Sequence, residues 1–306
     1  MAVILALRAL GIGDLLTGLP ALRALRAAHP DDRLVVAAPA SLQPLLKRAD
    51  CADALHPTSD LAAFEWPGPP PELAVNLHGS GPQSITALAA TRPGTLLTHA
   101  HPEFPHLAGP AWDPSPHEVD RWCRLLEWAA VPTDRNRLEL AVDAPRLGHV
   151  IVHPGASAPA RRWPLDHFGA VAAHLRERGF TVVLTGSADE RPLTDTVAML
   201  AGLPASASRA GDHSIDELVH LVAGARLLVS ADTGVGHLAT AVSTPLVLLF
   251  GPVSPAQWGP PPYLRRHHAL WAGLPGDPFA DTPDPGLLAL TATQVIAAVE
   301  TQLRET

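Results

Sequence analysis

Asp14 lies directly after a glycine loop near the start of the chain. The apolar run 2–7 is typical of a buried parallel strand, and Gly11-Ile12-Gly13 separates it from a stretch with helical spacing. Leu16 replaces the third glycine of a dinucleotide-binding loop, and an aspartate at this helix N-terminus would repel a pyrophosphate. NAD or FAD binding is therefore not expected. Asp14 is either a helix cap or a general base, with a pKa that the helix N-terminus should lower.

A second glycine loop, His153-Pro154-Gly155-Ala156-Ser157, follows an apolar run in the middle of the chain. Small residues at such a turn let backbone N–H groups approach a phosphate. Arg161 and Arg162 come shortly after it, before Trp163-Pro164. Two adjacent arginines often form a solvated surface pair, but beside a glycine loop and a helix N-terminus they could clamp a diphosphate.

The segment Asp232-Thr233-Gly234-Val235-Gly236-His237 also follows an apolar run and opens a helix. Its polar residues either cap that helix around a core histidine, or bind a phosphate and accept hydrogen bonds from sugar hydroxyls. The segment Gly186-Ser187-Ala188-Asp189-Glu190 offers a similar choice. It is either an ordinary helix start or a site for a ribose or base.

These segments belong to strands that alternate with helices, which indicates parallel sheets and right-handed βαβ units. The predicted strands are residues 2–7, 34–38, 73–77, 150–153, 181–185, 227–230 and 246–250. The predicted helices are residues 15–28, 117–130, 164–178, 215–223, 236–242 and 292–304. The fold class is therefore α/β, with two doubly wound Rossmann-like domains whose strand ends face one cleft.

The junction between the domains is expected within residues 132–148. We place an N-terminal domain at residues 1–145 and a C-terminal domain at 146–306, whose last helix could return to the first domain. Residues 99–116 are rich in His and Pro and show no period. This segment is either an ordinary surface loop, or an ordered loop near the cleft or a flexible lid.

Composition narrows the possible partners. The net charge of −8 argues against a nucleic-acid binder, which needs a basic face. The two cysteines lie outside any CxxC or Cys/His cluster, so neither a disulfide framework nor a structural zinc site is expected. No signal peptide or spanning segment is predicted. We expect a cytoplasmic protein with at most peripheral membrane contact.

Three blocks of this sequence together resemble glycosyltransferase family 9, the ADP-heptose:lipopolysaccharide heptosyltransferases. They are Arg8-Ala9-Leu10-Gly11-Ile12-Gly13-Asp14 with Pro20-Ala21-Leu22-Arg23, His153-Pro154-Gly155 through Arg162-Trp163-Pro164, and residues 230–239 running on to Thr244-Pro245 and Phe250-Gly251-Pro252. The resemblance covers nearly the whole chain in order and spacing. The chain departs from the family pattern at Arg161, where a lysine is expected, and at Gly236, where serine or methionine is common.

The resemblance implies a GT-B fold, an acceptor site in the N-terminal domain and a nucleotide-sugar site in the C-terminal one. It also implies metal-free inversion, with Asp14 as the base. The predicted acceptor-binding residues are Gly13 and His78. The predicted donor-binding residues are Gly155, Ser157, Arg161, Glu190, Asp232, Thr233, Gly234 and His237.

The sequence predicts an inverting glycosyltransferase with no cofactor. Its donor is a nucleotide sugar, possibly ADP-heptose, and its acceptor is a carbohydrate, a natural product or a glycolipid. Two alternatives stay open: a nucleotide-sugar epimerase of the same architecture, and a non-catalytic nucleotide-sugar-binding protein. An epimerase would isomerise the donor without an acceptor, whereas a binding protein would bind the donor without turnover.

Overall fold

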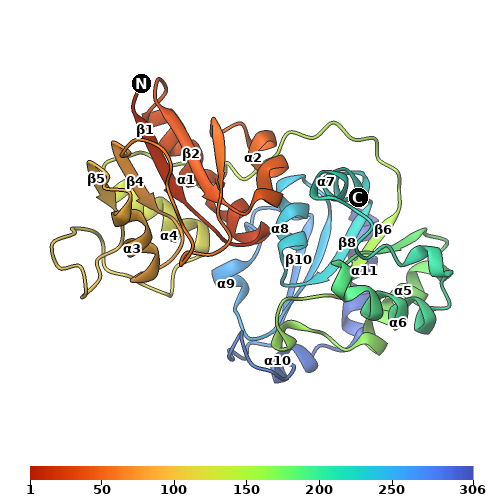
Figure 1. Ribbon diagram of the computed structural model, residues 1–306. Coiled ribbons are helices and arrows are strands. Elements are labelled where there is room, and N and C mark those ends of the chain that lie inside the picture. Colours follow the sequence, from red (N-terminus) through yellow and green to blue (C-terminus); the bar gives the residue numbers. More distant parts are fainter. Residues whose placement is uncertain (306) are drawn as a thin grey trace. The chain divides into compact units, whose positions relative to one another are not determined.

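The computed structural model describes residues 1–305, and the chain divides into two compact units, Met1–Leu140 and Ala141–Thr306 (Figure 1). The first unit contains β1 (Val3–Leu7), α1 (Ile12–Ala28), β2 (Arg33–Ala38), α2 (Gln43–Ala49), β3 (Ala54–Pro57), β4 (Leu73–Asn76), α3 (Gln83–Ala90), β5 (Thr95–Leu97) and α4 (Glu118–Trp128). The second unit contains β6 (Val150–His153), α5 (Leu165–Glu177), β7 (Val182–Leu184), α6 (Arg191–Ala201), α7 (Ile215–Gly224), β8 (Leu227–Ala231), α8 (Gly234–Ala241), β9 (Leu246–Phe250), α9 (Pro255–Trp258), β10 (His267–Trp271), α10 (Pro285–Leu288) and α11 (Ala292–Glu305).

The first unit is built on a parallel sheet with the strand order β3-β2-β1-β4-β5. Its central strands are apolar because both faces of the sheet are covered, and Leu5, Leu7, Val35 and Ala74 meet in the core. The chain reverses its direction of winding between β1 and β4. In such sheets ligands bind at this point, beyond the carboxyl ends of the strands.

The second unit repeats this design with the order β10-β9-β8-β6-β7, again with parallel pairs. Here the winding reverses between β6 and β8. His153, the last residue of β6, pairs in register with Ser230 near the end of β8. The loops after these two strands therefore begin side by side.

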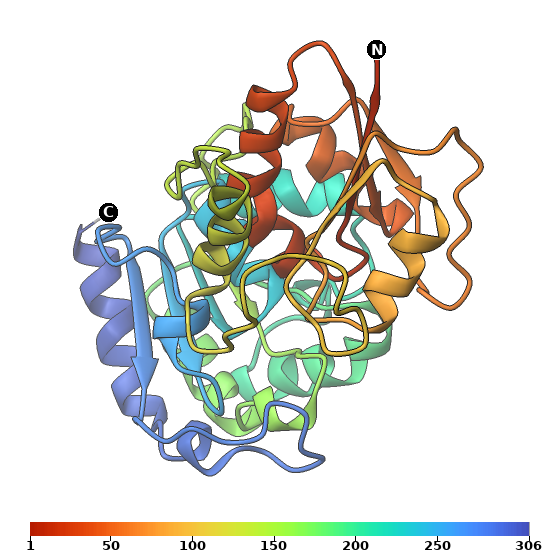
Figure 2. The same cartoon turned by 90° about the vertical axis from the view of Figure 1, so that its left-hand side faces the viewer.

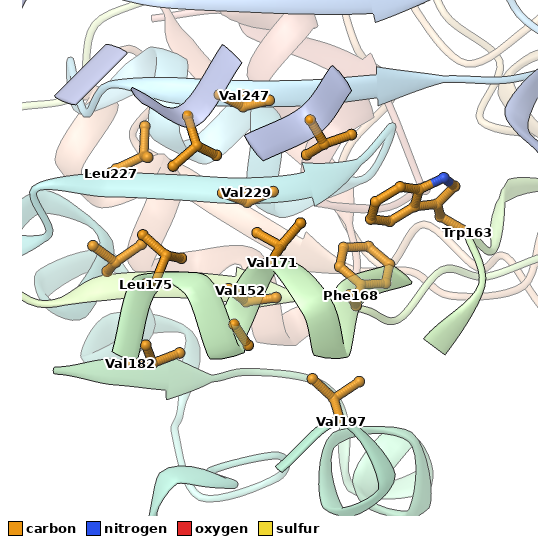
Figure 3. Close-up of a cluster of buried hydrophobic side chains, with 14 of the residues drawn as sticks. Val152, Trp163, Phe168, Val171, Leu175, Val182, Val197, Leu227, Val229 and Val247 are labelled. Carbon is orange, nitrogen blue, oxygen red and sulfur yellow. The ribbon is translucent and has the colours of Figure 1, made fainter. Parts of the chain in front are cut away.

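The core of the second unit holds the loop after β6 in place (Figure 3). Trp163 is 1% exposed, packs edge-on against Phe168, and donates its indole N–H to the Leu290 carbonyl at 2.9 Å. Burying an aromatic side chain of this size contributes about 2–3 kcal/mol, so this residue anchors the segment immediately before α5.

The last helix, α11, packs on the second sheet through Val295, Val299 and Leu303 and lies against β10 and β9 (Figure 2). The segment 99–116 has no regular helix. A bridge between Ala100 and Ala111 joins its two sides, and whether the segment acts as a lid stays a prediction. No helix within residues 1–305 is both long enough and apolar enough to cross a membrane.

Candidate active site

Asp14 lies in the first turn of α1, as the third residue of the helix. The N-cap is Gly11, whose backbone N–H donates to Asp14 Oδ2 at 3.2 Å. Asp14 is therefore not the N-cap residue itself, although it satisfies a backbone donor at the helix start. Its side chain stays 29% exposed, so one face of the carboxyl is open to solvent or to a ligand.

The charge environment of Asp14 differs from the expectation based on the helix N-terminus. Burial raises the pKa of Asp14 above its usual 3.8, although the Arg8 guanidinium opposes this change. The prediction of a lowered pKa is wrong because desolvation outweighs the favourable charges around the helix end. A raised pKa makes the carboxylate a stronger base.

Arg8 lies behind Asp14 and is a residue to which the sequence assigned no role. It is fully buried, although it carries a charge. Its guanidinium donates to Glu118 Oε1 at 3.0 Å and to Thr17 Oγ1 at 3.1 Å, and also to the carbonyls of Leu77 and Asp14. An arginine directly after an apolar strand is the sign of this arrangement that the sequence offers.

The two predicted acceptor residues flank this end of the sheet. Gly13 is buried in the first turn of α1, and its carbonyl accepts from Thr17 Oγ1 at 3.0 Å. His78 follows β4, and burial together with the nearby Arg8 charge lowers its pKa to about 4. Its Nδ1 is buried and has no hydrogen-bond partner within residues 1–305. His78 is therefore a neutral imidazole at pH 7 with unused hydrogen-bonding capacity.

In the second unit, the loops after β6 and β7 are in direct contact. A Cβ atom added to Gly155 would lie 2.2 Å from Glu190 Oε1, so only glycine permits this approach. The Ser187 backbone N–H donates to Glu190 Oε2 at 2.8 Å, which fixes the carboxylate. His153 is buried beside them with Nδ1 3.0 Å from Thr185 Oγ1, and burial lowers its pKa. The structure thus brings the predicted residues Gly155 and Glu190 together.

The two arginines after this loop have different surroundings. Arg162 Nε donates to the Ala156 carbonyl at 3.1 Å, so Arg162 braces the loop. Arg161 Nε is buried and has no hydrogen-bond partner in the part of the chain that the structure describes. Leaving a charged donor unsatisfied is costly, and a bound anion would remove the cost. Ser157 is exposed in the same loop.

The loop after β8 presents the remaining predicted residues. Helix α8 begins at Gly234, two residues before the predicted start, so Thr233 is its N-cap. The Thr233 side chain makes no capping bond; its Oγ1 lies 2.9 Å from Ser230 Oγ. Asp232 is 7% exposed, and its Oδ1 lies 3.9 Å from His237 Nε2. A carboxylate, a hydroxyl and backbone N–H groups therefore cluster at this helix start.

A metal site in a protein needs several ligating side chains close together. Within residues 1–305, no group of three or more His, Cys, Asp or Glu side chains is placed to hold a metal ion. Whether the reaction is metal-free stays a prediction.

The sequence matches the family model described as "Glycosyltransferase family 9 (heptosyltransferase)" over residues 112–284, which is more than half of the chain. The chain belongs to glycosyltransferase family 9. The family resemblance drawn from the three sequence blocks is confirmed.

Individual relatives of this family 9 protein agree with the assignment. Lipopolysaccharide heptosyltransferase 2 of Escherichia coli K12 is 35% identical over 124 residues, covering 39% of this chain and 35% of that protein. Curated relatives of this kind are matched over 32% to 56% of their own length.

Solved structures with the same fold cover nearly the whole chain. The E. coli ADP-heptose lipopolysaccharide heptosyltransferase II superposes with a TM-score of 0.78 at 22% identity, over 99% of this chain and 98% of that one. An E. coli heptosyltransferase solved with ADP gives a TM-score of 0.71 at 16% identity, over 98% and 99%. At this identity the likeness shows the fold. Two parallel-sheet α/β units of the GT-B class are present, as predicted.

Proposed function

We propose that this protein is an inverting glycosyltransferase that moves a sugar, plausibly a heptose from ADP-heptose, to an acceptor hydroxyl without a metal ion. The observation that supports this most strongly is Asp14, an accessible carboxyl of raised pKa at the point where the first sheet reverses its winding. Family 9 membership supplies the reaction class, since the relatives are named as heptosyltransferases.

We assign donor binding to the second unit. The Arg161 guanidinium and the backbone N–H groups of the Gly155 and Thr233 turns would bind the diphosphate. Glu190 and Asp232 carry carboxylates that can accept hydrogen bonds from ribose and sugar hydroxyls. Gly234 and His237 lie in the first turn of α8, directly after Thr233. In the loop after β6, the exposed Ser157 can donate to a phosphate oxygen. The fold likeness to a heptosyltransferase solved with ADP supports this choice of nucleotide.

We assign the acceptor to the first unit, next to Gly13 and His78. The neutral imidazole of His78 can accept from or donate to a sugar hydroxyl at pH 7. The relatives' names indicate a lipopolysaccharide acceptor. The net charge of −8 offers no general attraction to a phosphorylated surface, so a carbohydrate or natural-product acceptor is an equal candidate. The cytoplasmic location stays a prediction.

In the proposed reaction, Asp14 removes the proton from the acceptor hydroxyl as its oxygen attacks the anomeric carbon. The bond from that carbon to the β-phosphate oxygen breaks, and the nucleoside diphosphate leaves with the electron pair. The attack from the opposite side inverts the anomeric centre. Arg161 and the helix N-termini stabilise the charge on the leaving group.

The pH dependence of the reaction should report the carboxyl of Asp14. Because the base acts in its ionised form and burial raises its pKa, kcat/KM should fall as the pH drops through a value above 3.8. Initial rates measured over a pH series give this acid limb of the profile, the range in which kcat/KM falls. Protonation of His78, whose pKa is about 4, is separated by repeating the series with His78→Gln. An acid limb that is absent, or that disappears in His78→Gln, would contradict the assignment.

The contact between Gly155 and Glu190 gives a second test. Gly155→Ala places a Cβ against the Glu190 carboxylate, which must move and lose its bond to the Ser187 N–H. We expect donor affinity to weaken by about 1 kcal/mol, the worth of one hydrogen bond, with little change in melting temperature. Calorimetry measures the affinity. In a Glu190→Ala background the same substitution should have no further effect, and an equal loss there would refute the link.

A thermal-shift panel of nucleoside diphosphates in EDTA tests the donor class, because a ligand that binds the folded state raises its apparent stability. ADP should give the largest shift. Incubation with the nucleotide sugar alone then tests the epimerase alternative, which predicts an isomerised donor. A shift that requires added metal would count against the proposal.

A further inference from the structure

The Arg8 guanidinium is buried at the carboxyl end of β1, entirely within the first unit. Taking such a charge out of water costs several kcal/mol unless hydrogen bonds and an opposite charge compensate it. Arg8 has both, since it contacts the Glu118 carboxylate, the Thr17 hydroxyl and the Leu77 carbonyl. These contacts hold the guanidinium in one position, so Arg8 can in turn fix the position of other groups that it contacts.

Glu118, at the first position of α4, is the anion that compensates Arg8. It is 4% exposed and accepts from Trp122 Nε1 at 2.7 Å and from Arg121 as well as from Arg8. Burial alone would raise the pKa of Glu118, but the Arg8 and Arg121 guanidiniums hold it below its usual value. The indole of Trp122 also lies under Arg8, with the guanidinium carbon 4.9 Å from the ring centre. Glu118 is therefore ionised, and the pair joins a positive guanidinium to a negative carboxylate.

Arg8 connects this pair to the first turn of α1. Its Nε donates to the Asp14 carbonyl, and its Nη2 lies 3.9 Å from Asp14 Oδ1. The helix leaves room for the side chain at Gly18, where an added Cβ would lie 2.8 Å from Arg8 Cδ and Nε. Glycine inside a helix costs about 1 kcal/mol relative to alanine, so the close approach of Arg8 to α1 comes at a cost in stability.

We propose that the buried Arg8–Glu118 ion pair holds the Asp14 carboxyl in place and balances the charge beside it, so that both are positioning residues. This inference rests on the proposed function only in taking Asp14 as the base. Both members of the pair are buried, whereas the Asp14 side chain is 29% exposed. The pair acts through Asp14 rather than on the substrate.

The two members of the pair act on Asp14 in opposite directions. Positive Arg8 favours the ionised carboxylate and lowers the pKa of Asp14, whereas negative Glu118 disfavours it and raises that pKa. Arg121, His78 and His99 are also charged or titratable groups near the pair. Arg121 pairs with Glu118, and both histidines are neutral above a pH of about 4. Removing one member of the pair should therefore shift the titration of Asp14 with a sign that is known in advance.

The experiment titrates the Asp14 carboxyl directly by carbon-13 NMR, assigned by the signal that Asp14→Asn removes. Glu118→Gln keeps an acceptor for Arg8 and Trp122 but removes the charge, and should lower the pKa of Asp14 by roughly 0.5–1. Arg8→Met should raise it by about 1 or more, the usual effect of losing an opposite charge within 4–6 Å. Asp120→Asn, which removes a charge from the same helix where it pairs with Arg135, is the control and should shift nothing.

Opposite shifts in Glu118→Gln and Arg8→Met, with partial recovery in Arg8→Lys, are the expected result. Shifts of the same sign, or none, would overturn the proposal. If Arg8→Met does not fold, Glu118→Gln decides alone. The titration needs no donor or acceptor, so its outcome is independent of whether Asp14 is the base. That question is decided by the turnover of Asp14→Asn.

Discussion

Asp14→Asn should lower turnover by about 10²–10⁴-fold, the usual contribution of a general base, while donor affinity and melting temperature stay close to those of the wild type. Asparagine keeps the size of the side chain and can still accept the Gly11 N–H bond at the start of α1. It cannot take a proton from the acceptor. Initial rates with saturating donor and acceptor measure the effect.

The substitution separates the base from the helix-start role of Asp14, because asparagine serves the second role but not the first. Near-wild-type turnover would show that the base lies elsewhere. Thr17→Ser, which keeps a hydroxyl against Arg8 on the same helix, is a control for local disturbance and should retain most of the activity. Donor affinity is measured in parallel, since donor binding is assigned to the other unit.

Arg161→Ala should weaken the binding of a nucleoside diphosphate by about 1.5–3 kcal/mol, the value of a charge-assisted hydrogen bond. The buried Nε of Arg161 has no partner among the described residues, so a bound phosphate is its expected acceptor. Calorimetry with ADP in EDTA measures the loss. The fold should be little affected, because the adjoining Trp163 anchors the segment independently.

Arg178→Ala is the matched control for this measurement. Arg178 is a half-exposed arginine of the same unit that pairs with Glu300, so its removal changes the net charge equally without touching the loop after β6. Arg161→Lys should restore part of the affinity, since it keeps the charge but loses the planar fork. Affinity that is unchanged in Arg161→Ala, or lost on chelation in the wild type, would contradict the assignment of this site.

The central strands of both sheets and the edge strand β7 could be predicted from the sequence, whereas the other three edge strands could not. The strands β1, β2, β6, β8 and β9 are buried on both faces and give continuous apolar runs, so their ends were predicted to within one residue. The strands β3, β5 and β10 lie at sheet edges and are only partly buried. Their mixed residues carry no clear pattern, so the sequence does not predict them.

The site was predictable where a glycine turn marks it. The turns at Gly11, Gly155 and Gly234 each follow a buried strand, and the structure places them at the carboxyl ends of β1, β6 and β8. The Arg8–Glu118 pair was not predictable, because its members are 110 positions apart and join only when α4 packs against α1. The raised pKa of Asp14 escaped prediction for the same reason, since burial depends on that packing.

The most direct test of the account is a transfer assay with the wild-type protein, ADP-heptose and a heptose-containing core oligosaccharide in the presence of EDTA. Phosphorus-31 NMR follows the released nucleotide, and proton NMR reads the anomeric configuration of the product. The account predicts ADP release only when the acceptor is present, and a new glycosidic bond of inverted configuration. An isomerised donor without acceptor, a product of retained configuration, or a reaction that stops when metal is chelated would contradict it.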